Sequence, residues 1–125
     1  MLNKFWKTKF ITMSKKIADN TFVHHVFFYL KNSDSKADQI KFFEGIDLLS
    51  SISTIRQFHV GVPATTNREV IVQNYTYSWL CFFDSAEDEA IYQSDPIHDK
   101  FRDHYGHLWE KVVIYDSTTS TPVIQ

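Results

Sequence analysis

The segment from Tyr92 to His98 contains two side chains that can take part in proton transfer. Its sequence is YQSDPIH, and a helix that ends before Pro96 can restart at that residue. Imidazole titrates at about pH 6.5, and a tyrosine hydroxyl can donate a hydrogen bond to a carbonyl that becomes an enolate. The spacing indicates an acid/base pair on either side of a helical elbow. A buried Tyr92 and a His98 that bonds a backbone carbonyl would fit the same residues.

The remaining histidines do not form a tight metal-binding motif. His24 and His25 are adjacent in a segment with the composition of a strand, so their side chains point to opposite faces. His104 and His107 are three residues apart on an expected helix and could bind zinc if a carboxylate joined them. A solvated helix face explains that pair as well, and His59 belongs to neither pair. We therefore expect no metal and no cofactor.

The composition favours a small globular protein with large buried surfaces. Eleven Phe, six Tyr and three Trp in 125 residues suggest a pocket or a partner subunit, because these side chains bury much apolar area. The net charge of −2 offers no basic patch for nucleic acid, and no apolar stretch is long enough to span a membrane. Cys81 lies in an apolar run and reads as a core residue, so we expect a cytoplasmic protein without disulfides.

The first twenty residues contain five lysines among aromatic and aliphatic side chains. They contain no uninterrupted apolar core of the length that a signal peptide requires. Met13 offers a second possible translation start, which would make residues 1–12 a loose extension or an artefact. We expect residues 1–20 to lie outside the folded core.

Seven elements are expected along the chain. Segments rich in β-branched and aromatic residues, or with alternating polarity, predict four strands, and apolar residues at intervals of three and four predict three helices. The strands are expected at 22–31, 55–62, 75–83 and 109–116, and the helices at about 36–52, 86–93 and 97–107. Ser85 and Asp95 are placed to cap the second and third helices. The order predicts one α+β domain.

The two most apolar strands have bulky groups on both faces. Tyr75, Tyr77 and Trp79 are expected on one face of the third strand, with Leu80 and Phe82 on the other. Helices on one side of a four-stranded sheet would leave an apolar face bare, and such a face is an interaction surface. Two copies related by a two-fold axis would cover it. The pattern therefore predicts a homodimer.

Four motifs together resemble the stress-responsive dimeric α/β-barrel (Dabb) family. They are His24-x-Val-x-Phe-x-Leu-Lys31, Phe83-x-Ser85, Tyr92-x-x-x-Pro96-x-His98 and Trp109-Glu-Lys leading to Asp116. The resemblance covers about residues 22–117 and implies a ferredoxin-like antiparallel sheet with helices on one face, paired as a dimeric barrel. It implies a domain at 21–117 between the extension 1–20 and a tail at 118–125. The last third is also similar to a plant polyketide cyclase of this family.

The resemblance implies roles by position. His98 would be the acid/base and Tyr92 its phenolic partner. A pocket between sheet and helices would be lined by His24, Val26, Phe28, Phe42, Phe43 and Trp109. The family often has a histidine before the proline, where this chain has Asp95, and the cyclase has a tyrosine where Ile46 aligns. A carboxylate close to His98 would raise the pKa of that histidine.

Three functions are consistent with these observations. The first is a dimeric protein without catalysis that binds a small hydrophobic ligand, or whose pocket is packed shut by Phe27, Phe28, Phe42 and Phe43. The second is a cofactor-independent cyclase or lyase that uses His98 and Tyr92. The third is a cofactor-independent monooxygenase. Fold alone does not decide among them.

Overall fold

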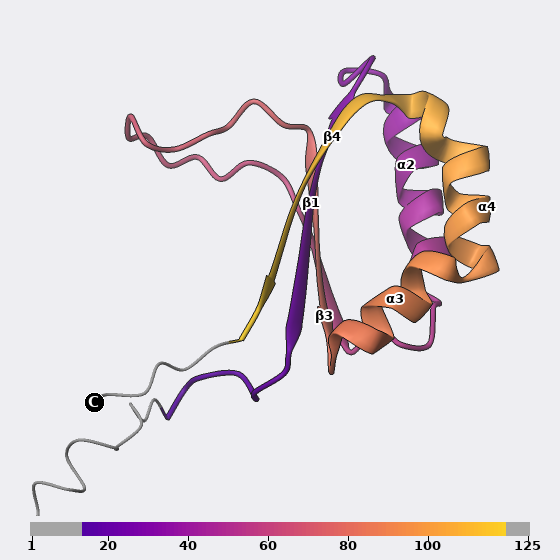
Figure 1. Cartoon of the computed structure of the whole chain (residues 1–125). Helices are drawn as coiled ribbons and strands as arrows, with labels where there is room; N and C mark the ends of the chain where they lie inside the picture. Colours follow the sequence, from indigo (N-terminus) through magenta and orange to yellow (C-terminus); the bar gives the residue numbers. More distant parts are fainter. Residues whose placement is uncertain (1–13, 120–125) are drawn as a thin grey trace, which may run out of the picture.

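The computed structural model describes residues 14–119, which form a four-stranded antiparallel sheet covered by helices on one face (Figure 1). The strand order is β2-β3-β1-β4. The strands are β1 (Phe22–Leu30), β2 (Gln57–Gly61), β3 (Tyr77–Phe83) and β4 (Trp109–Thr118). This arrangement confirms the expected ferredoxin-like α+β fold. The expectation for residues 1–12 lies outside the described residues.

Two of the helices begin directly after the capping residues expected from the sequence, Ser85 and Asp95. The helices are α2 (Lys36–Leu49), α3 (Ala86–Ser94), α4 (Pro96–Tyr105) and a short 3-10 helix (Gly106–Leu108). The hydroxyl of Ser35 accepts a hydrogen bond from the amide of Asp38, and the hydroxyl of Ser85 accepts one from the amide of Asp88. These bonds satisfy amides that have no partner within a helix. In the described part of the chain, no helix is both long and apolar enough to cross a bilayer.

The core lies between the sheet and the helices. Alternate residues of β1, including Val26, Phe28 and Leu30, are buried there, because successive side chains of a strand point to opposite faces. Trp79 and Cys81 of β3 are fully buried on the same side. Burial raises the pKa of the Cys81 thiol, so this residue is a poor nucleophile and a core side chain.

The sheet face opposite the helices carries a separate group of aromatic side chains. The ring of Phe27 lies 4.8 Å from that of Tyr75 and 6.2 Å from that of Tyr115. Tyr75 was expected to share a face of the third strand with Tyr77 and Trp79, and this expectation is wrong: β3 begins only at Tyr77, so the alternation does not extend back to Tyr75. The loop 62–76 projects from the sheet on this open side (Figure 1).

Several boundaries differ from those expected. The first helix ends at Leu49, and the amide of Ser50 bonds back to the carbonyl of Ile46. The second strand is limited to five residues, Gln57–Gly61. The last strand continues past Asp116 to Thr118, because β1 offers it backbone partners as far as Phe22.

Candidate functional site

The elbow between α3 and α4 directs the side chain of His98 toward the interior of the protein. Asp95 ends α3 and caps α4, its carboxylate accepting a hydrogen bond of 2.8 Å from the amide of Ile97. Pro96 is the first residue of α4, where its missing N–H costs no helical hydrogen bond. His98 therefore lies in the first turn of α4, and only 9% of its surface is exposed.

Tyr92 and His98 meet next to Trp79. Their ring centroids are 4.9 Å apart, with the planes at 79°. The hydroxyl oxygen of Tyr92 accepts a hydrogen bond of 3.1 Å from the indole N–H of Trp79. The Nδ1 atom of His98 is buried and has no hydrogen-bond partner within the described part of the chain. A ligand atom that reached this nitrogen would satisfy it.

The surroundings keep both side chains neutral near pH 7. Burial lowers the pKa of His98, and the charges of Arg102 and His24 lower it further, whereas Asp99 and Asp95 act in the opposite direction without outweighing them. Burial raises the pKa of Tyr92. A neutral imidazole can accept a proton and a neutral phenol can donate a hydrogen bond.

A cavity of about 280 Å³ lies between the sheet and the helices beside these two residues. Six of the residues singled out in the sequence line it: His24, Val26, Phe28, Tyr92, His98 and Trp109. Phe42 and Phe43 do not belong to its lining. Phe42 is fully buried and stacks on Tyr77 at 4.7 Å between ring centroids, and Phe43 is 44% exposed. The phenylalanines do not fill this space, so the pocket is not packed shut.

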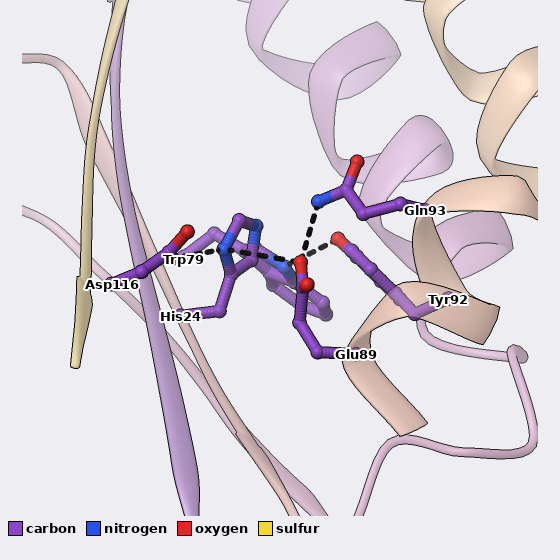
Figure 2. A network of polar contacts seen from close by, with 6 residues as sticks. All are labelled: His24, Trp79, Glu89, Tyr92, Gln93 and Asp116. Atoms are coloured by element: carbon purple, nitrogen blue, oxygen red, sulfur yellow. Dashed lines mark hydrogen bonds and ion pairs between the residues drawn. The ribbon is translucent and has the colours of Figure 1, made fainter. Parts of the chain in front are cut away.

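His24 lies between two carboxylates at one side of this cavity (Figure 2). Its Nδ1 atom is 2.6 Å from Oδ1 of Asp116, which is its register partner on β4. The same nitrogen is 3.9 Å from Oε2 of Glu89 on α3. Gln93 donates a hydrogen bond of 2.8 Å from Nε2 to that carboxylate oxygen. Figure 2 shows Glu89 and Gln93 reaching from the helix toward the sheet.

Three side chains of the candidate site were not anticipated from the sequence: Glu89, Gln93 and Arg102. The signal that was available is helical spacing, because Glu89 stands three residues before Tyr92 and four before Gln93 and so shares a face with both. In the sequence, Asp116 was noted only as the last residue of a motif. Its contact with His24 could not be predicted there, because it depends on the register of β1 and β4.

Comparison with known proteins yields three relevant similarities. The chain is 29% identical to olivetolic acid cyclase of Cannabis sativa over 97 residues, which cover 76% of this chain and 93% of the cyclase. The structure of hydroxynitrile lyase from Passiflora edulis is 17% identical with a TM-score of 0.69, covering 82% of this chain and 96% of the lyase. A dimeric ferredoxin-like protein of unknown function from Thermobifida fusca is 12% identical with a TM-score of 0.65, covering 87% of this chain and 100% of that chain.

The two structural similarities are at low identity and show the fold alone. The family comparison carries more weight, because residues 22–119, most of the chain, match the family described as Stress responsive A/B Barrel Domain. This match includes the first strand, the elbow at Pro96 and the last strand, which together carry His24, Tyr92, His98 and Asp116. The chain therefore belongs to the stress responsive A/B barrel domain family.

Proposed function

We propose that this protein is a homodimer whose cavity binds a small, mainly apolar molecule carrying a carbonyl group. The observation that carries the proposal is the unpartnered Nδ1 atom of His98 beside a cavity of about 280 Å³. Ligand cavities in proteins commonly start at about 300 Å³, so this volume suits a small ligand. Phe28, Trp79, Phe101 and other apolar side chains make up much of its lining.

The open sheet face supports the homodimer. Tyr115 is 67% exposed there, and Phe27, Val72, Tyr75 and Val113 join it around a hollow of about 400 Å³. Aromatic side chains in an open hollow favour association, because burying them removes apolar area from water. A second copy offers the same surface, and the ferredoxin-like protein from Thermobifida fusca is dimeric.

The polar groups of the cavity indicate which ligand it prefers. Tyr92 and His98 lie side by side, and neither is charged near neutral pH. Arg102 lines the same cavity from α4. A carbonyl oxygen can accept a hydrogen bond from one of these groups, whereas a pure hydrocarbon would leave them unpaired. We therefore expect selectivity for a carbonyl compound over a hydrocarbon of the same shape.

Acetophenone and ethylbenzene form a suitable pair of probes, because they differ mainly by the carbonyl oxygen. Quenching of the fluorescence of Trp79 and Trp109, which both line the cavity, reports binding. We expect acetophenone to bind about threefold to tenfold more tightly, as one net hydrogen bond would give. His98→Asn should reduce that preference, and His104→Asn, an exposed change on the same helix, should retain it. Equal affinities in the wild type would refute the proposed ligand class.

A second candidate function is cofactor-independent proton transfer of the kind a cyclase or lyase uses. It is favoured by the neutral His98 and by the hydrogen bond from Trp79, which occupies an acceptor site of Tyr92 and leaves the hydroxyl hydrogen for a ligand. His98 would take a proton from the carbon next to a carbonyl. The C–H electron pair would form a carbon–carbon double bond while the π pair of the carbonyl moves onto its oxygen, and Tyr92 would stabilise the resulting enolate oxygen.

Deuterium exchange tests this step without a known product. Acetophenone in heavy water should lose its methyl protons faster in the presence of the protein, as measured by proton NMR. His98→Ala should abolish the acceleration, because the proposed base is removed, and Tyr92→Phe should reduce it. An acceleration that His98→Ala leaves unchanged would exclude this mechanism while leaving the binding proposal intact.

A further inference from the structure

We propose that His24, Glu89 and Asp116 bind one divalent transition-metal ion. The Nδ1 atom of His24 lies 2.6 Å from Oδ1 of Asp116 and 3.9 Å from Oε2 of Glu89. The three potential ligand atoms lie within 4.8 Å of one another. Ligand atoms placed about 2.0 to 2.2 Å from one ion are separated by roughly 3 to 3.5 Å. A small side-chain rotation would therefore bring all three around a single ion.

Three different elements hold the ligand groups. His24 on β1 and Asp116 on β4 are register partners, so the backbone ladder fixes their separation. Glu89 lies on α3, which begins at Ala86 and is anchored by its cap, Ser85. Gln93, one turn along the same helix, orients the Glu89 carboxylate through a hydrogen bond of 2.8 Å. Such outer contacts commonly orient metal ligands in proteins.

The charges of the group favour a cation. Glu89 and Asp116 both have an ion-pair contact with the same nitrogen of His24. A single imidazolium would therefore face two carboxylates and leave one negative charge uncompensated. The side chains of His24 and Glu89 are only 3% and 13% exposed and that of Asp116 is 43% exposed, so water screens the charge poorly on the side of Glu89. A divalent ion bound by neutral His24 would balance both carboxylates.

The ligand set indicates the class of metal. One imidazole nitrogen with two carboxylate oxygens suits zinc, iron(II) or manganese(II), whereas magnesium and calcium prefer sites made of oxygen alone. Zinc binds more tightly than manganese or iron(II) at a site of given ligands. Three protein ligands leave a coordination position for water or for a ligand oxygen. Because His24 also lines the cavity, the ion would lie at the border of the space proposed for the ligand.

Titration calorimetry with zinc chloride on the full chain, previously treated with a chelator, tests the site. We expect one zinc ion per chain and a much weaker response to magnesium chloride. Glu89→Gln keeps the size of the side chain and removes its charge, so zinc affinity should fall at least about tenfold. Glu87→Gln changes an exposed glutamate in the same turn of α3 and should leave the affinity unchanged. Asp116→Asn, at an exposed position of β4, provides a second ligand variant.

Competing zinc ligands are removed by repeating each titration in a His104→Gln/His107→Gln background, since both histidines are exposed. Circular dichroism shows that each variant is folded, and the visible absorption of bound cobalt(II) reports the coordination of the ion. Absence of binding, binding that disappears in that background, or equal affinities for Glu89→Gln and Glu87→Gln would overturn the proposal. The acetophenone titration is made without metal, so its outcome is independent of this one.

Discussion

Trp79 donates its indole N–H to the hydroxyl oxygen of Tyr92 across 3.1 Å, which joins β3 to α3 inside the core. Both side chains are fully buried. A buried polar group that loses its partner destabilises the folded state, because water in the unfolded chain still satisfies it. The bond therefore affects stability as well as the orientation of the phenol beside His98.

Tyr92→Phe should lower the free energy of unfolding by about 1 to 3 kcal/mol, because the N–H of Trp79 would remain buried without an acceptor. Urea unfolding followed by tryptophan fluorescence measures the change. Tyr29→Phe is the matched control, since the hydroxyl of Tyr29 bonds to Asn74 at an exposed position. A loss for Tyr92→Phe no larger than that for Tyr29→Phe would show that the buried bond does not stabilise the fold.

His98 should make the stability of the protein depend on pH. Its pKa in the folded state is lowered from the ordinary value of 6.5, chiefly by burial. Below pH 6.5 the unfolded chain binds a proton that folded His98 resists, so the free energy of unfolding should decrease as the pH falls toward the folded-state pKa. Above pH 6.5 this contribution should be constant.

Urea unfolding of the wild type and of His98→Gln between pH 5 and pH 8 isolates this effect. His25, whose pKa is also lowered, is present in both proteins and contributes to both curves. The difference between the two curves should be constant above the ordinary pKa of His98 and should change only below it, where the wild type loses stability relative to His98→Gln. Parallel curves over the whole range would mean that folding does not perturb the titration of His98.

Tyr115→Glu should convert the proposed homodimer to a monomer. Tyr115 lies on the open sheet face and is 67% exposed in one chain, so the substitution should leave the fold of that chain intact while placing a charge in the interface. Light scattering coupled to gel filtration at micromolar concentration measures the mass. Ile91→Glu on α3 is a control at a half-exposed apolar position on the helix side. A monomeric wild type would contradict the prediction directly.

Gly45→Ala should destabilise the contact between α2 and α4. A Cβ atom at Gly45 would lie 2.8 Å from Cγ of Tyr105 and 3.1 Å from Cε1 of Phe101. Overpacking of this kind costs about 1 to 3 kcal/mol. Gly106→Ala is the control, because its nearest contact would be 3.8 Å away, at Trp109. Thermal unfolding compares the two, and an equal or smaller loss for Gly45→Ala would show that the rings move aside.

The fold could be predicted largely because local signals agree with tertiary packing. The cap at Ser85 and the restart at Pro96 depend on residues within one turn of each helix, so the sequence is sufficient to place them. Tyr75 was misplaced because alternation has meaning only inside a strand, and β3 begins two residues later. The position of that boundary depends on pairing with β1, which is distant in sequence.

The site was less accessible to sequence reasoning. Tyr92 and His98 are near each other along the chain, and they do meet in the structure. Glu89 and Asp116 reach His24 only through the register of the sheet and the rotation of α3 over it. Phe42 was assigned to the pocket by position, but its ring stacks on Tyr77 within the core. Contacts between distant elements decide such details, and no local pattern reports them.

Strand β4 presents its side chains alternately to two different surfaces. Val112 and Ile114 line the cavity, whereas Val113 and Tyr115 line the hollow on the opposite face. One extended backbone at the edge of the sheet thus borders both surfaces. If the proposed ligand shifts β4 when it binds, ligand binding and the proposed self-association are linked equilibria, in which each alters the free energy of the other by the same amount. The affinity of the cavity would then vary with the concentration of the chain itself, and expression level would act as an effector.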